Sequence, residues 1–110
     1  MTPRVTTKFW IDAYRKRLDL IGIMAFVAAK GDETAGAVLI KLNLLNGQAR
    51  LFQRSYDADF NRIWTEMEAG AEADIDAVVA RARSHDPDLW VIEVEDRAGR
   101  HLLDEEGLSG

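Results

Sequence analysis

The side chains best suited to hold a ligand or a partner lie on two stretches of the chain, and the first stretch is a predicted hairpin. Asn46-Gly47 marks its turn, because both residues tolerate the positive φ that a two-residue type I′ turn needs. Counting outward from that turn pairs Lys41 with Phe52 and sets the register of the two strands. One face then carries Lys41, Asn43, Arg50, Phe52 and Arg54. Three cations, an amide and an aromatic ring on a rigid hairpin are suited to an anion or a partner.

Two acids lie on a second stretch, where Glu93 and Glu95 alternate with apolar residues in the segment 90–95. This alternation is typical of a strand with one apolar face. If the segment joins the same sheet as the hairpin, we expect the two glutamates to pair with its cations. Carboxylates also suit Mg²⁺ or Ca²⁺, but acids two apart on a strand are usually solvated or paired with arginine, so we predict no metal site and no cofactor.

The usual signals of catalysis are missing from the sequence. The chain has no cysteine, no Gly-x-Ser-x-Gly elbow and no dinucleotide fingerprint. The loop 31–36 contains two glycines, but it also contains two acids and lacks the Lys-Ser/Thr pair of a phosphate-binding loop. His85 and His101 stand in no recognisable motif, so no catalytic residue is predicted, and the sequence leans against an enzyme.

Hydrophobic periodicity predicts the elements that position these residues. Helices are expected over 7–21 and 73–85, and strands over 23–30, 37–45, 48–56, 90–95 and 100–103. The segment 57–70 fits either state, and Ile63, Trp64 and Thr65 favour a strand over about 62–68. The apolar run 23–30 suggests a strand buried on both faces. We predict an α+β domain with the order α-β-β-β-β-α-β-β, in which both helices cover one face of a mainly antiparallel sheet.

Length and charge limit the kinds of protein and of partner that are compatible with the sequence. The 110 residues suit a single domain, 1–110, with a frayed acidic tail over 104–110. Residues 1–55 carry nine Lys/Arg against four Asp/Glu, whereas residues 56–110 carry five against fifteen, so the halves are expected to complement each other. The net charge of -5 makes nucleic acid an unlikely partner. Without cysteines or a run of ~20 apolar residues, we expect a cytoplasmic protein with no membrane partner.

Several stretches resemble the domain of unknown function 1491 family of small bacterial proteins. The resemblance rests on Thr34 to Asn43, on Asn46-Gly47 and above all on Asp86-Pro87-Asp88-Leu89-Trp90 through His101. It implies a cytoplasmic bacterial single domain with no established activity, and so it supplies no catalytic residues.

We therefore carry three hypotheses. The leading hypothesis is a non-enzymatic binding or assembly module. One version of it is a homodimer that associates through the other face of the sheet or an edge strand. The alternative is a small anionic-ligand or hydrolytic site on the polar sheet face, with Lys41, Asn43 and Arg50 holding the anion. The third is weak RNA binding through Lys41, Arg50, Phe52 and Arg54.

Overall fold

The computed structural model describes residues 5–105 and Leu108, and these residues form two helices and one five-stranded sheet. The elements in chain order are α1 (Thr7–Leu20), β1 (Met24–Ala29), β2 (Val38–Asn43), β3 (Gln48–Tyr56), β4 (Arg62–Ala71), α2 (Glu72–His85) and β5 (Trp90–Glu95). The strand order is β1-β5-β2-β3-β4, and only the β2–β5 pair is parallel. The predicted α+β class with a mainly antiparallel sheet is confirmed, and the ambiguous segment 57–70 contains a strand.

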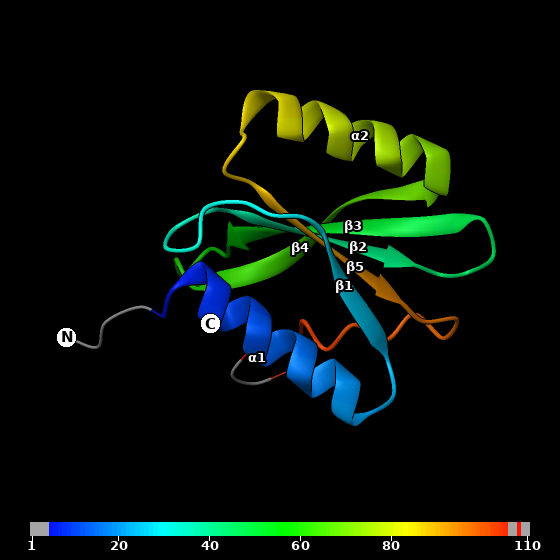
Figure 1. Cartoon of the computed structure of the whole chain (residues 1–110), viewed down its shortest axis with the longest axis horizontal. Helices are drawn as coiled ribbons and strands as arrows, with labels where there is room; N and C mark the ends of the chain where they lie inside the picture. The colour runs from blue at the N-terminus through cyan, green and yellow to red at the C-terminus, as the bar shows by residue number, and fades with distance from the viewer. Residues whose placement is uncertain (1–4, 106–107, 109–110) are drawn as a thin grey trace.

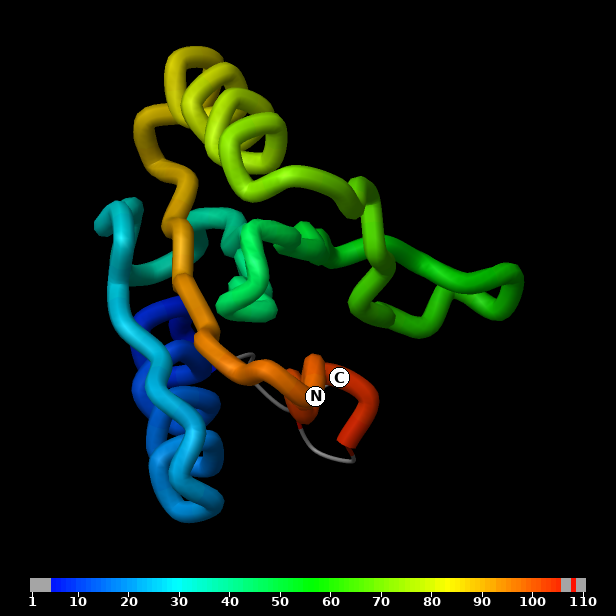
Figure 2. The backbone as a smooth tube through the Cα atoms, turned by 90° about the vertical axis from the view of Figure 1, so that its right-hand side faces the viewer, coloured from blue at the N-terminus to red at the C-terminus, as the bar shows by residue number. Residues whose placement is uncertain are grey.

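The two helices lie on opposite faces of the sheet (Figures 1 and 2), so the prediction that both cover one face is wrong. Side chains of β2 alternate between the faces: Ile40 and Leu42 pack with Trp10 and Leu18 of α1, whereas Leu39 packs with Ile75 of α2. Both faces of the central strand β2 are therefore covered, and all six of its residues are buried, including Lys41 and Asn43.

Helix α1 follows its sequence pattern closely. Its buried residues are Trp10, Ile11, Tyr14 and Leu18, which recur at the spacing of one helix face. The hydroxyl of Thr6 caps the helix by accepting a hydrogen bond from the backbone N–H of Phe9 at 3.2 Å. The helix ends before Gly22, whose φ of +78° turns the chain back into β1.

Strand β1 lies at the edge of the sheet, so the prediction of a strand buried on both faces is wrong. It pairs only with β5 among the described strands, and most of its residues are exposed. The exposed fractions of Met24 and Phe26 are 65% and 39%. The apolar run was compatible with a central strand, but sheet order is set by which strands pair, and no local pattern reports it.

The β2–β3 hairpin forms with a register one residue away from the predicted one. Lys41 pairs with Leu51 instead of Phe52, because Leu45, Asn46 and Gly47 form a three-residue turn. The side chain of Asn43 accepts a hydrogen bond from the backbone N–H of Leu45, which has a φ of +60°. Since side chains alternate with period two, this shift moves every β3 side chain to the face opposite the predicted one.

The segment after β5 does not form the predicted return strand over 100–103. It crosses the face that α1 covers, where the hydroxyl of Tyr14 donates a hydrogen bond to the carbonyl of His101 at 2.8 Å. Leu103 and Leu108 are buried in the same core as α1. The predicted frayed tail, 104–110, falls partly outside the described residues, but at Leu108 the chain is packed.

The loop between β1 and β2 packs against the backbone at Asp88. A Cβ atom placed on Gly31 would lie 2.0 Å from the Asp88 carbonyl oxygen, and one on Gly36 would lie 2.4 Å from it. The indole N–H of Trp90 donates to the carbonyl of Asp32 at 2.7 Å, which holds the loop in place. The glycines of this loop therefore serve close backbone packing.

We expect Gly31→Ala to lower the free energy of unfolding by about 2 kcal/mol, because the added methyl group meets backbone that cannot move away cheaply. Urea denaturation followed by tryptophan fluorescence measures the change. Ala35→Ser, at an exposed position of the same loop, is the control and should change stability by less than about 0.5 kcal/mol. Equal stability of Gly31→Ala and the unsubstituted chain would contradict the packing argument.

Candidate functional site

The seven residues predicted to share a ligand or partner face lie on both faces of the sheet. The shift in hairpin register places Lys41 and Asn43 on the α2 face, together with Glu93 and Glu95 of β5. Arg50, Phe52 and Arg54 lie on the α1 face. The two glutamates were expected to pair with the hairpin cations, and the arrangement does bring Glu93 to Lys41. It separates Lys41 from Arg50 and Phe52.

Lys41 is the centre of an ion cluster beneath α2. Its side chain is 5% exposed, and its Nζ lies 2.7 Å from a carboxylate oxygen of Glu72, 2.7 Å from one of Asp76 and 3.2 Å from one of Glu93. The amide of Asn43 donates to Glu72 at 3.0 Å and to Glu93 at 3.3 Å. Three carboxylates around one ammonium leave no positive charge for an external anion, so the cluster acts as a clamp between α2 and the sheet.

The pKa of Lys41 is higher than its ordinary value. Burial alone would lower this pKa, but the hydrogen bonds to Asp76 and Glu72 and the charge of Glu93 outweigh that effect. A lysine whose pKa rises on folding stabilises the folded state fully below its unfolded pKa of 10.5. This stabilisation is lost only as the pH rises through the higher folded value.

On the α1 face, Arg50 and Phe52 belong to a small cluster around His101. Arg50 forms an ion pair with Glu66 of β4, and its guanidinium carbon lies 5.1 Å from the centre of the Phe52 ring. The Phe52 and His101 rings are 4.7 Å apart. Burial lowers the pKa of His101, and the charge of Arg50 lowers it further, against the opposing charges of Asp104 and Glu66.

Arg54 lies over two tryptophan rings farther along the same face. Its guanidinium carbon is 4.5 Å from the ring centre of Trp64 and 5.4 Å from that of Trp10. The carbonyl of Leu108 accepts hydrogen bonds from the Trp64 indole at 3.2 Å and from Arg54 at 3.4 Å. The sequence pattern alone did not associate these residues, which come from α1, β3, β4 and the C-terminal segment.

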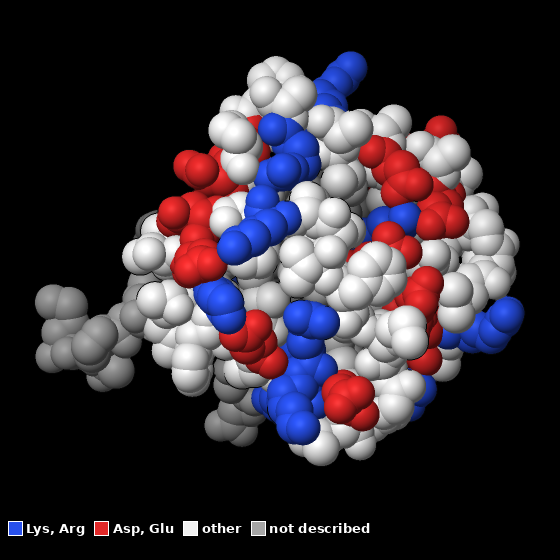
Figure 3. Space-filling model, viewed as in Figure 1, with Lys and Arg blue, Asp and Glu red and all other residues white. Residues whose placement is uncertain are grey.

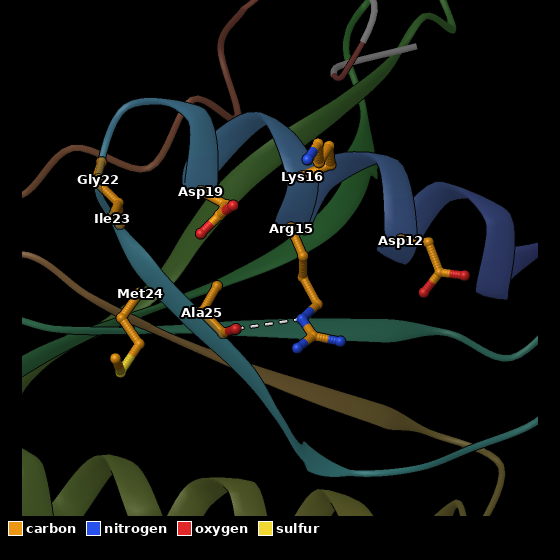
Figure 4. Close-up of a pocket in the computed structure, with 8 residues that line it drawn as sticks. All are labelled: Asp12, Arg15, Lys16, Asp19, Gly22, Ile23, Met24 and Ala25. Atoms are coloured by element: carbon orange, nitrogen blue, oxygen red, sulfur yellow. Dashed lines mark hydrogen bonds between the residues drawn. The ribbon is translucent and has the colours of Figure 1, made fainter.

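The edge strand β1, which was predicted to lie in the interior, presents exposed apolar side chains at Met24, Phe26 and Val27. Figure 3 shows a largely uncharged strip where β1 crosses the face toward the viewer, with charged side chains on either side. Next to it, a shallow cavity of about 440 Å³ separates the strand from α1. Figure 4 shows Arg15 reaching from α1 to the carbonyl of Ala25, with a donor–acceptor distance of 3.2 Å. The absence of charge over 24–29 was the signal that could have indicated this surface.

Two further findings concern the described residues alone. Within 5–105 and Leu108, no group of three His, Asp or Glu side chains is arranged to hold a metal ion. Over the same residues, neither helix is long and apolar enough to cross a membrane.

Comparison with known proteins identifies the family. The model of the DUF1491 family, described as proteins of unknown function, matches residues 5–104. The chain belongs to the DUF1491 family. The resemblance read from the sequence is thus confirmed over nearly the whole chain.

Solved structures of DUF1491 proteins share the fold. A crystal structure of a family protein from Caulobacter crescentus CB15 is 44% identical, covers 93% of this chain and 97% of that one, and has a TM-score of 0.84. An NMR structure of a family protein from the same organism is 43% identical, covers 94% of this chain and 96% of that one, and has a TM-score of 0.79.

Protein Atu0922 from A. tumefaciens is similar at 28% identity, covering 84% of this chain and 86% of its own, with a TM-score of 0.71. No curated protein matches the chain. Membership in DUF1491 therefore establishes the fold and carries no activity with it.

We expect Lys41→Met to lower the free energy of unfolding by about 3 kcal/mol at neutral pH, because it leaves three carboxylates, among them the mostly covered Glu93, with no cation between them. Urea denaturation at neutral pH measures the change.

Arg81→Met, which removes an exposed cation of α2 away from the β1 edge, is the control for Lys41→Met and should stay within about 0.5 kcal/mol of the unsubstituted chain. Adding Glu93→Gln to Lys41→Met should recover part of the loss. A Lys41→Met variant as stable as the control would contradict the role of the ion cluster.

His101 makes the stability of the folded chain depend on pH. Its pKa is lower in the folded state than the ordinary 6.5, so stability is complete above that value and falls as the pH drops below it. We expect His101→Phe, which keeps a ring beside Phe52, to lose less stability than the unsubstituted chain over this range. Parallel denaturation curves at each pH would show it, and an unchanged slope would rule His101 out as the cause.

Proposed function

We propose that this protein is a non-enzymatic binding and assembly module that associates with a second copy of itself through the edge strand β1, in the cytoplasm that its sequence predicts. The observation that carries the proposal is the character of that edge. Met24–Ala29 contains no charged residue and is largely exposed. Exposed edge strands of natural proteins usually carry charges or prolines that prevent pairing, so an edge without them is suited to pair.

The backbone of β1 supports this pairing. The carbonyl of Ala25 accepts a hydrogen bond from Arg15 on α1, so it points away from β5. In an antiparallel ladder both backbone groups of a residue point to the same side, and this property alternates along the strand. The N–H groups of Ala25 and Val27 therefore also point toward the free edge, where a second strand would bind.

The side chains of the edge are complementary to themselves. Met24 and Phe26 share the α2 face with Glu95 and Glu93, their partners on β5, but α2 packs over β2, β3 and β4 and leaves them exposed. If two copies of β1 pair antiparallel about Ala25, Met24 of one copy lies opposite Phe26 of the other. Such apolar cross-strand pairs are the units that stabilise antiparallel sheets.

Charges on the neighbouring helix fit the same two-fold arrangement. Asp12, Arg15, Lys16 and Asp19 line the shallow cavity along α1, with acids at both ends and bases in the middle (Figure 4). Two such helices brought together antiparallel can set acids of one copy against bases of the other. Arg15 can exchange its hydrogen bond with the Ala25 carbonyl for a carboxylate when the second strand binds.

Light scattering after size exclusion, at low and high salt and over a wide range of protein concentration, tests the proposal. We expect a dimer that becomes a monomer in Phe26→Lys, because the lysine of each copy would lie opposite Met24 of the other and place a charge in the apolar paired edge. Phe60→Lys is the matched control, since Phe60 is 84% exposed in the turn between β3 and β4, and it should leave the dimer intact.

Hydrogen exchange supplies a second measurement on the same samples. The Ala25 amide should be protected in the dimer and should exchange faster in Phe26→Lys, while amides of the central strand β2 stay protected in both. A monomer at high protein concentration under both salt conditions would overturn the proposal.

A further inference from the structure

Helix α2 leaves part of its own face of the sheet uncovered. It packs over β2, β3 and β4, whereas β5 and β1 continue the same sheet beyond it. The opposite face of β5 and β1 is covered, because Ala25, Ile92 and Val94 pack in the core under α1. Neighbouring strands lie about 4.8 Å apart, so β5 and β1 together form a surface about 10 Å wide, which is the diameter of one helix.

Strand β1 supplies the apolar part of this uncovered face. Met24 and Phe26 point to it, and their exposed fractions are 65% and 39%. Between them the alternation of the strand turns Ala25 toward α1. Two large apolar side chains on one face gain free energy when a second apolar surface covers them.

Strand β5 places acids directly beside these apolar side chains. Glu95 is the strand partner of Met24, and Glu93 is the strand partner of Phe26. Figure 3 shows acidic side chains gathered to the right of the uncharged strip that β1 forms. Each large apolar side chain of this face therefore has a carboxylate next to it, on the side toward α2.

The acids of this face outnumber the cations at its centre. Lys41 is one cation among three carboxylates, so the ion cluster beneath α2 retains two negative charges. Glu95 is not a member of that cluster and adds another. The guanidinium groups of Arg83 and Arg97 lie beyond the two ends of the face, where they donate to backbone carbonyls of loops. The acidic centre favours a basic occupant and repels nucleic acid and anionic lipid.

We propose that the uncovered face of β1 and β5 binds an amphipathic helix of a partner protein, with an apolar stripe and a basic flank. The stripe covers Met24 and Phe26, and lysines or arginines of the flank face Glu93 and Glu95. Amphipathic helices are commonly recognised through such an apolar stripe. The inference goes beyond self-association, because it uses the face of β1 and leaves its backbone edge for a second copy.

A labelled synthetic peptide of about 14 residues, four turns of helix, is the probe. It carries leucines at the spacing of one helix face and lysines elsewhere. A second peptide has the same composition in an order that gives no apolar stripe, so the two differ only in amphipathic character. Fluorescence anisotropy should show saturable binding of the first peptide. We expect the second to bind about tenfold more weakly, since it cannot bury its leucines together.

Substitutions test the two parts of the face separately. Phe26→Ala should weaken binding of the first peptide about tenfold, because it removes an aromatic anchor. Glu95→Lys should weaken it by a similar factor, since it reverses a charge without disturbing the cluster around Lys41. The matched controls are Phe60→Ala in the exposed turn after β3 and Glu68→Lys on the exposed part of β4, and both should leave the affinity unchanged.

An NMR titration of the unsubstituted chain avoids any dependence on how the variants fold. The methyl resonance of Met24 and the amide resonance of Glu95 should shift on addition of the first peptide. The indole N–H resonance of Trp64, on the α1 face, should not. Equal affinity for the two peptides, unmoved Met24 and Glu95 resonances, or equal losses in Glu95→Lys and Glu68→Lys would each overturn the proposal.

Light scattering on the same samples separates this proposal from self-association. A monomer that binds the first peptide at Met24 and Phe26 would overturn the dimer and support the helix site. A dimer that does not bind the peptide would overturn the helix site alone.

Discussion

The structure depends on the parallel pairing of β2 with β5 at the centre of a sheet that is covered on both faces. Each side chain of these strands belongs to one face or the other, so the register of neighbouring strands decides which residues can meet. Ile40 and Leu42 with Ile92 form the core under α1, whereas Leu39 belongs to the core under α2. A shift of one residue between two strands exchanges the environments of all their side chains.

Lys41 shows how a charged side chain is accommodated on a strand that is covered on both faces. It is placed on the α2 face of a buried strand, and it is tolerated there because carboxylates from α2 and β5 surround its ammonium group. Those acids come from the acidic half of the chain and Lys41 from the basic half. The ion pair of Arg50 with Glu66 also joins the two halves. Ion pairs within one molecule therefore balance part of the charge difference between the two halves of the sequence.

Where the two helices and the C-terminal segment do not reach, the edge of the sheet at β1 is left uncovered. The residues of this edge, Met24–Ala29, carry no charge and are largely exposed. Strand β1 pairs only with β5 among the described strands.

Local sequence was sufficient to predict most of the helices and strands. The helices expected over 7–21 and 73–85 depend on apolar spacing among residues a few positions apart, and the structure has helices over Thr7–Leu20 and Glu72–His85. The contact of Glu93 with Lys41 is one of the pairings expected between the two glutamates and the hairpin cations if their strands share a sheet. The family resemblance, carried by local motifs, was correct for the same reason.

Tertiary structure alone decided the rest. The apolar run 24–29 reads equally well as a central or an edge strand, and only long-range pairing with β5 shows that it is an edge. Asn46-Gly47 indicated a hairpin, but the side chain of Asn43 and the contact of the turn with α2 set its register. The opposite placement of the helices, and the meeting of Trp10, Arg54 and Trp64, arise from packing between residues far apart in the chain. Periodicity along a strand reports how its side chains alternate, but not which neighbour covers each face.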